Sequence, residues 1–110
     1  MGKRMITFDT TEVVAMVEIK GDGEFKKAQT RILSMTYDKF TKIIFEPCME
    51  WKFFKKVPSE KIVIKLKAMR QPIEFTKMKN KEFYEEYKEG FRVFAAKNRI
   101  DLYDMTAKKE

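Results

Sequence analysis

The side chains that could do chemistry in this 110-residue chain are carboxylates and lysines, because the sequence has no histidine and one cysteine. Histidine is the usual general base, the usual partner of a nucleophilic serine or cysteine, and the commonest zinc ligand. Its absence excludes hydrolytic triads and zinc fingers. The lone Cys48 excludes an internal disulfide, and we interpret it as a small buried apolar residue. Carboxylate and lysine chemistry remains, with or without a hard metal such as magnesium.

Positive charge is concentrated in one part of the sequence. The segment from Trp51 to Lys81 has ten cations and two anions, a net charge of +8, whereas the rest of the chain carries −1. Such a local excess attracts phosphate or an acidic protein surface. Aromatic rings beside lysines on a sheet can also stack unpaired bases while the ammonium groups hold the backbone. We therefore predict a binding surface on one sheet face, made of Trp51, Lys52, Phe53, Lys55, Lys61, Lys65, Lys67 and Arg70.

The same composition also has a purely structural explanation. Lysines keep a sheet soluble and protect its edges, and aromatic residues on strands are usually core. Of the ten cations only Arg70 is an arginine. Arginine makes the bidentate hydrogen bonds that recognise guanine or phosphate, so any binding should be weakly sequence-specific. The expected partner is a nucleic acid or an acidic protein surface, and we expect no cofactor.

One short pattern suggests catalysis. Asp9, together with the Glu-Ile-Lys-Gly run at 18–21, resembles the metal-binding core of the PD-(D/E)xK nucleases over roughly residues 9–45. The resemblance implies Asp9 and Glu18 as magnesium ligands and Lys20 as the catalytic lysine. Glu-x-Lys recurs at 24–26, 50–52 and 86–88, so the pattern is common in this chain. If residues 10–12 form a turn, Glu18 lies about 16 Å along the strand from the level of Asp9. A surface strand ending in a charged turn is therefore the preferred interpretation.

The elements that would carry these side chains are mostly strands. Residues 5–20 are rich in β-branched residues, with a hairpin turn at 10–12 and a glycine turn at 21–23. Residues 24–40 fit both helical and strand spacing, and we favour a helix for 24–35. Further strands are expected at 43–45, 50–56 and 61–69, with turns at 57–60 and 70–72 and a last strand beginning at 73–75. In the 61–69 strand, Lys61, Lys65 and Lys67 share one face.

The C-terminal part predicts an amphipathic helix. Phe83, Tyr87, Phe91 and Phe94 are spaced by four, four and three residues, which places them along one stripe. Asn80 is the expected N-cap. Gly90 inside the helix should cost about 1 kcal/mol relative to alanine unless close packing requires it. Asp101 and Asp104 are expected to lack partners, and residues 106–110 to form a frayed polar tail.

Together these patterns predict one α+β domain over residues 1–105. We expect a mostly antiparallel sheet of five to seven strands packed against the C-terminal helix. A helix capping a strand-rich roll looks like the PH-like fold, which would make 24–40 a strand and adaptor or phospholipid-headgroup binding the rival function. With no apolar run near the roughly 20 residues of a membrane span, we expect a cytoplasmic protein. The working hypothesis is a non-enzymatic small regulator or inhibitor, bacterial or phage, that binds RNA, DNA or a nucleoprotein complex.

Overall fold

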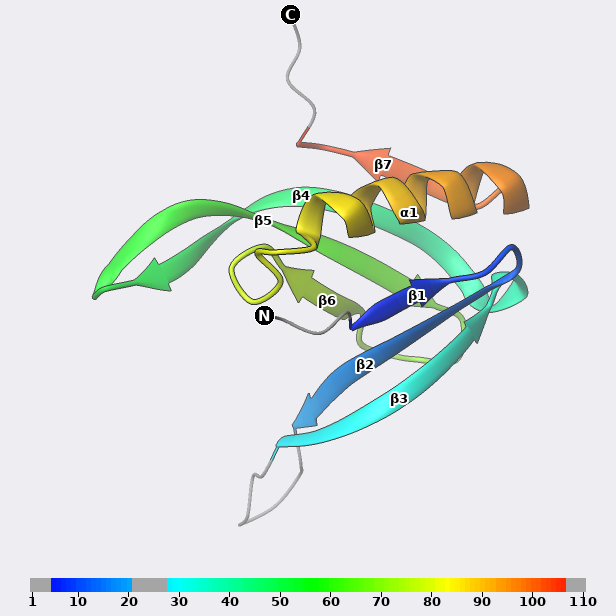
Figure 1. The fold of residues 1–110 in the computed structure, drawn as a ribbon, viewed down its shortest axis with the longest axis horizontal. Helices are drawn as coiled ribbons and strands as arrows, with labels where there is room; N and C mark the ends of the chain where they lie inside the picture. Colours follow the sequence, from blue (N-terminus) through cyan, green and yellow to red (C-terminus); the bar gives the residue numbers. More distant parts are fainter. Residues whose placement is uncertain (1–4, 21–27, 107–110) are drawn as a thin grey trace, which may run out of the picture.

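The computed structural model describes residues 5–20 and 28–106, and only the backbone of 18–20 and 28–29. The described elements follow in the order β1 (Ile6–Phe8), β2 (Glu12–Lys20), β3 (Ala28–Thr36), a 3-10 turn (Tyr37–Lys39), β4 (Phe40–Lys52), β5 (Lys55–Leu66), β6 (Ile73–Thr76), α1 (Tyr84–Asn98) and β7 (Asp101–Asp104). Strands β1-β2-β3 form one antiparallel sheet, and β6-β5-β4-β7 form a second, in which β7 runs parallel to β4. Helix α1 packs against both sheets (Figure 1). The predicted α+β class is confirmed, whereas a PH-like roll is not shown.

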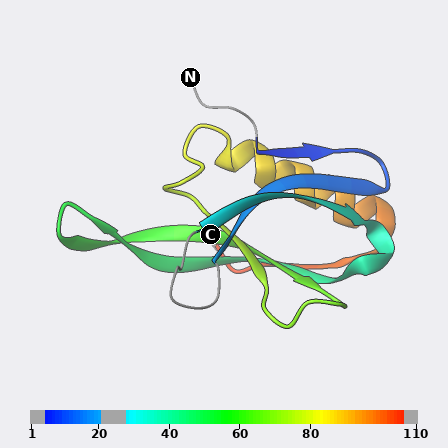
Figure 2. The same ribbon diagram turned by 90° about the horizontal axis from the view of Figure 1, so that it is seen from below.

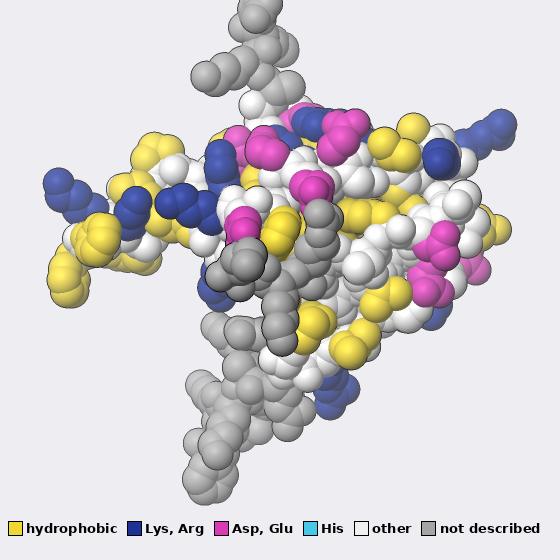
Figure 3. Space-filling view, viewed as in Figure 1, with side chains coloured by type: hydrophobic (Ala, Val, Ile, Leu, Met, Phe, Trp, Pro, Cys, Tyr) yellow, Lys and Arg dark blue, Asp and Glu magenta, His cyan; other side chains and the backbone are white. Residues whose placement is uncertain are grey.

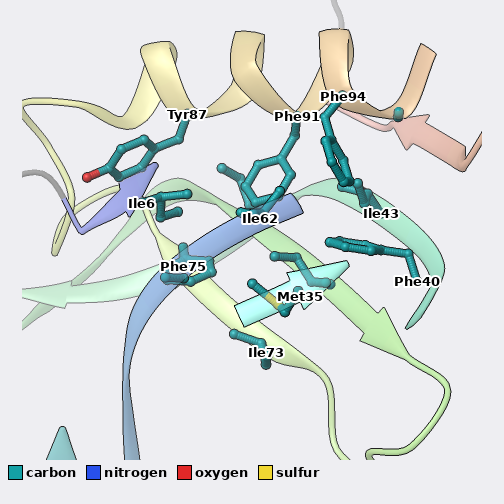
Figure 4. Close-up of a cluster of buried hydrophobic side chains, with 14 of the residues drawn as sticks. Ile6, Met35, Phe40, Ile43, Ile62, Ile73, Phe75, Tyr87, Phe91 and Phe94 are labelled. Atoms are coloured by element: carbon teal, nitrogen blue, oxygen red, sulfur yellow. The ribbon is translucent and has the colours of Figure 1, made fainter. Parts of the chain in front are cut away.

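The inward side chains of both sheets and of α1 meet in one core (Figure 4). From α1, the side chains of Tyr87, Phe91 and Phe94 point toward the sheets and are buried, as the predicted stripe requires. Each such side chain stabilises the fold by roughly 1.5–3 kcal/mol through burial. The three-stranded sheet and α1 lie over one half of the four-stranded sheet, and the β4–β5 hairpin extends beyond them (Figure 2).

The helix favoured for residues 24–35 is wrong where the structure describes it, because 28–36 form β3; residues 24–27 lie outside the described part. Strand β3 pairs with β2 along its whole length. Helical spacing would place Ile32 and Met35 on one side. In the strand Ile32 is 71% exposed and Met35 is 1% exposed. Pairing with β2 therefore decides between two patterns that the sequence leaves nearly equal.

The long β4–β5 hairpin also departs from the expectation of short strands. Strand β4 passes through Pro47 and β5 through Pro58, and the turn predicted at 57–60 does not form. Proline lacks the N–H that a second neighbouring strand would need, so it occurs on strand edges. Strand β7 pairs with β4 only over 42–45 and β6 pairs with β5 only over 61–64, which leaves both prolines where the ladder is two-stranded.

The ends of several other elements also differ from the prediction. Strand β5 stops at Leu66 instead of continuing to 69, and β7 was not predicted. Helix α1 begins after Phe83 with no side-chain cap, since the Asn80 amide donates to the Thr76 carbonyl. The predicted hairpin turn forms, but at 9–11 instead of 10–12, because Glu12 already begins β2; strand β6 is confirmed.

Asp104 has partners, contrary to the prediction. The Arg92 guanidinium donates to its carboxylate at 2.8 Å, and Thr106 donates through both its hydroxyl and its backbone N–H. Burial alone would raise the pKa of Asp104, but these hydrogen bonds outweigh it and hold the pKa at about 2. They tie β7 to α1 and order Thr106, which was expected to fray; residues 107–110 lie outside the described part.

Asp104 should make the stability of the fold depend on pH in the acid range. Its folded pKa of about 2 lies below the ordinary 3.8, so the stabilisation is present above pH 4 and is lost as the pH falls toward 2. The Asp104→Asn variant should be less stable than wild type by about 2 kcal/mol at pH 7 and should approach it near pH 2. Urea unfolding across this range measures the difference. Asp101→Asn is the control. If the difference in free energy of unfolding between wild type and Asp104→Asn stayed constant with pH, the ionisation of Asp104 would not be its cause.

Gly90 is required by close packing. A Cβ at this position would lie 2.4 Å from Cε2 of Phe8, whose ring packs edge-on against Phe91 at a centroid distance of 4.8 Å. Overpacking of about 1–3 kcal/mol should exceed the helix-propensity gain of about 1 kcal/mol, so Gly90→Ala should lower the free energy of unfolding by about 1 kcal/mol. Urea titration measures this. In a Phe8→Leu background Gly90→Ala should lower the free energy of unfolding by less. If Gly90→Ala stabilised the wild-type protein, the proposed clash with the Phe8 ring would be disproved.

Candidate functional site

The most distinctive feature of the structure is the outer half of the β4–β5 hairpin, residues 47–60, here called the arm. Its two strands pair with each other from Pro47–Glu60 to Lys52–Lys55. Six residues of extended chain make it about 20 Å long. It projects past α1 and past the three-stranded sheet (Figures 1 and 2). An exposed two-stranded ribbon of this kind adds little to the core, so its surface chemistry needs another explanation.

The arm ends in a two-residue turn made of Phe53 and Phe54. Both have left-handed backbones, with φ of 49° and 64°. Two-residue hairpins favour this conformation because it matches strand twist, and they normally place Asn or Gly in it. For residues with a Cβ the left-handed region costs roughly 1–2 kcal/mol each. Phenylalanine at both positions is therefore unfavourable for the turn itself.

The rings near this turn are in solvent. Trp51 is 68% exposed, Phe53 is 84% and Phe54 is 99%. Lysine ammonium groups lie over two of them, with Lys56 Nζ 5.5 Å from the Trp51 ring centroid and Lys52 Nζ 5.9 Å from that of Phe53. Residues 51–56, here called the tip, hold three aromatic and three lysine side chains and no acidic one. Apolar and basic side chains gather at this end of the molecule (Figure 3).

A groove lies where the arm leaves the body of the protein. It has a volume of about 680 Å³ and, besides Val57, Pro58, Ser59, Glu60 and Met78, it is lined by Lys52, Lys77 and Lys81. We call it the lysine groove. The backbone N–H of Lys77 donates to the Glu60 carbonyl at 2.9 Å, which holds the loop after β6 against the arm. Lysines about 25 residues apart in the sequence thus border one concave surface.

The carboxylates beside the lysine groove are occupied by internal partners. Glu50 accepts hydrogen bonds from the Ser59 hydroxyl and the Met78 N–H. Glu60 accepts from Lys88 Nζ at 3.0 Å, and Lys88 is 5% exposed. The buried ammonium therefore offsets the Glu60 charge. Residues 47–60 and 77–81 together contain six lysines, and these two glutamates are their only acidic residues.

The predicted site residues separate into three groups. Trp51, Lys52, Phe53 and Lys55 come together at the tip. Lys61 lies in the middle of β5, with Nζ at 3.3 Å from Glu74 and 3.5 Å from Glu46. Burial tends to lower the pKa of Lys61, but these two carboxylates outweigh it and raise the pKa. Its charge is therefore already paired.

The third group is exposed at the opposite end of β5 from the tip and consists of Lys65, Lys67 and Arg70. Lys65 is ten residues from Lys55 along the strand, roughly 33 Å. Lys67 lies beyond the end of β5, so the prediction that Lys61, Lys65 and Lys67 project from one strand face is wrong. The structure does not gather the predicted set into one surface.

Three residues at the candidate site were not predicted. Phe54 belongs to the basic, aromatic segment, but its place at the apex was missed because Phe-Phe is not a turn signal and 50–56 were expected to form a strand. Lys77 and Lys81 belong to the basic segment, but no local pattern shows that their loop returns to the arm. The pairing of Lys52 with Lys55 locates the turn in the structure, but no local pattern in the sequence marks it.

The metal-site alternative gains no support from the described residues. Phe8, rather than Asp9, pairs with Val13, so Asp9 lies level with Glu12 and Glu18 lies six residues further along β2, one more than predicted. The side chains of Glu18 and Lys20 lie outside the described part. Among the described side chains, no three acidic or thiol groups come together as a metal site. Cys48 is half-buried, and burial with the nearby Glu50 charge raises the pKa of its thiol, so it is not an activated nucleophile.

The turn geometry predicts a stabilising substitution. Replacing Phe53→Asn and Phe54→Gly supplies residues that tolerate left-handed φ, so the double variant should unfold with a free energy about 1 kcal/mol higher than wild type, or about 4 °C in Tm. Thermal and urea unfolding measure this. The matched Phe53→Ala/Phe54→Ala variant removes the rings but keeps the backbone penalty and should not gain stability. A destabilised Asn-Gly variant would mean that the rings support the fold.

Comparisons with protein-family models, with curated proteins and with solved structures find no match for this chain. Within the described residues, no helix has the length and apolar character needed to cross a membrane. The tip and the lysine groove are therefore the features from which a function is inferred.

Proposed function

We propose that this protein is a non-enzymatic module that binds nucleic acid through the tip and the lysine groove. The observation that carries the proposal is the convergence of Lys52, Lys77 and Lys81 around one concave surface whose neighbouring carboxylates are held by internal partners. Phosphate groups are the anions that such a lysine cluster suits. Affinity would come mainly from the release of counterions from the phosphate backbone.

The composition of the site bears on specificity. All six cations of the arm and the adjoining loop, 47–60 and 77–81, are lysines, and a lysine ammonium is a point charge without the planar fork that reads guanine. Contacts made by these groups would position a sugar-phosphate backbone and carry little sequence information. The protein would therefore bind many sequences with similar affinity.

A salt-dependent binding measurement tests the proposal. Fluorescence anisotropy with labelled single-stranded RNA, single-stranded DNA and duplex DNA, at about 50 and about 200 mM salt, should show affinity falling steeply with salt. Lys77→Ala/Lys81→Ala should weaken binding about ten-fold at the lower salt and reduce the slope of log K against log salt by about 1–2. No binding to any of these nucleic acids at low salt would refute the proposal.

The chain offers a control with the same change of net charge. Lys65 and Lys67 are also exposed, but they lie at the far end of β5 from the groove. Lys65→Ala/Lys67→Ala should bind within about two-fold of wild type, because only nearby charges neutralise bound phosphates. If both double variants weaken binding equally, the net charge of the protein, rather than the groove, determines the affinity.

A further inference from the structure

We propose that the tip is a stacking element that selects unpaired bases, so that the protein binds single-stranded nucleic acid in preference to duplex. This inference rests on the proposed function and specifies its substrate. It starts from the Phe53-Phe54 turn, where two rings stand in solvent on a backbone conformation that phenylalanine disfavours. Neither the turn nor the core gains from these rings, so a contact with another molecule is the function left for them.

The geometry of the tip leaves ring faces available. Phe54 is 99% exposed, which means that its ring meets solvent on both sides. Lys52 and Lys56 lie over the Phe53 and Trp51 rings, yet these two residues remain 84% and 68% exposed. A base could stack on such a face while the adjacent ammonium meets its phosphate. Base stacking on aromatic side chains accepts every base, which agrees with the sequence tolerance expected of lysine contacts.

Unpaired bases suit these rings better than paired ones. In a duplex each base face is covered by its neighbours, and a protein ring reaches one only by unstacking a step. In a single strand the bases can splay outward onto aromatic side chains. The tip is a slender ribbon end whose apex presents ring faces together with lysines. Paired bases offer it phosphate contacts, whereas unpaired bases offer it phosphate and stacking contacts together.

The lysine groove extends this site toward the body of the protein. Lys52 belongs to the tip and also lines the groove, so the two surfaces are continuous. A strand whose bases stack at the tip can continue with its phosphates beside Lys77 and Lys81. The arm length of about 20 Å corresponds to only a few nucleotides of extended strand, so the site size should lie near the lower end of the about 4–16 nucleotides that single-strand-binding folds cover.

Trp51 is the only tryptophan of the chain and lies in the tip, so its fluorescence reports on this contact directly. Titration with oligothymidylate of about 12 nucleotides, which does not form a duplex with itself, should quench the Trp51 emission. A mixed-sequence duplex of the same length should quench it far less. Oligothymidylate should also bind at least about five-fold more tightly than this duplex at equal salt.

The decisive variant is Phe53→Asn/Phe54→Gly, because its turn is expected to be at least as stable as that of wild type. It should bind oligothymidylate about ten-fold more weakly and duplex about as well as wild type. Phe53→Tyr/Phe54→Tyr keeps aromatic rings and should retain single-strand affinity. Ile32→Ala, which trims a 71% exposed apolar side chain on β3, should leave binding unchanged.

The outcomes separate the two proposals. If duplex and oligothymidylate bind equally, and the Asn-Gly variant binds both as wild type does, the stacking inference fails while the lysine groove proposal stands. If no nucleic acid binds at low salt, both fail. Vesicles of mixed phosphatidylserine and phosphatidylcholine test the other use of an aromatic and basic tip. A blue shift of Trp51 emission with these vesicles, without quenching by oligothymidylate, would overturn the inference in favour of an anionic lipid surface.

Discussion

The antiparallel pairing of β4 with β5 is the constraint on which both the core and the candidate site depend. At its inner end Ile43, Phe45 and Ile62 are fully buried. Side chains alternate along a strand, so a slip of one residue would turn this row out of the core. The register that keeps these residues inside also sets which residues meet at the other end of the hairpin. Burial at one end of the ladder therefore places Phe53 and Phe54 in the turn.

The energetic balance shows why the fold tolerates such a turn. Two left-handed phenylalanines cost roughly 2–4 kcal/mol together. A single buried core side chain contributes roughly 1.5–3 kcal/mol, and the core contains many of them. Registers that would place better turn residues at the apex require the buried row to shift. The backbone strain of the turn is thus smaller than the burial energy that a shift of the β4–β5 register would lose. Stability alone does not explain why the turn carries two exposed rings.

The sequence predicted the features that depend on local pattern and missed those that depend on pairing. The aromatic stripe of α1 and the strand at 73–75 follow from spacing, and both are confirmed. Residues 28–36 satisfy two periodicities, and only the presence of β2 beside them selects the strand. Pro47 and Pro58 suggested that the strands end near them. A strand tolerates proline where no second neighbouring strand pairs with it, and no local rule shows where that is the case. The tip was predicted in part, since Trp51, Lys52, Phe53 and Lys55 are neighbours in the chain, whereas Lys77 and Lys81 reach it through tertiary contacts.

The two halves of the candidate site are held differently, and this bears on how it would bind. The base of the arm is fixed by hydrogen bonds from Lys77 and Met78 of the loop and by the buried Lys88 of α1. The backbone that carries the lysine groove is therefore held in place without any ligand. Beyond Glu50 the described interactions of the tip are those within the hairpin itself, between its paired strands and between lysines and rings. In such an arm, lysine contacts at the base would set the path of a nucleic-acid strand, and the rings at the tip would adjust to successive bases. This arrangement suits a ligand of irregular shape.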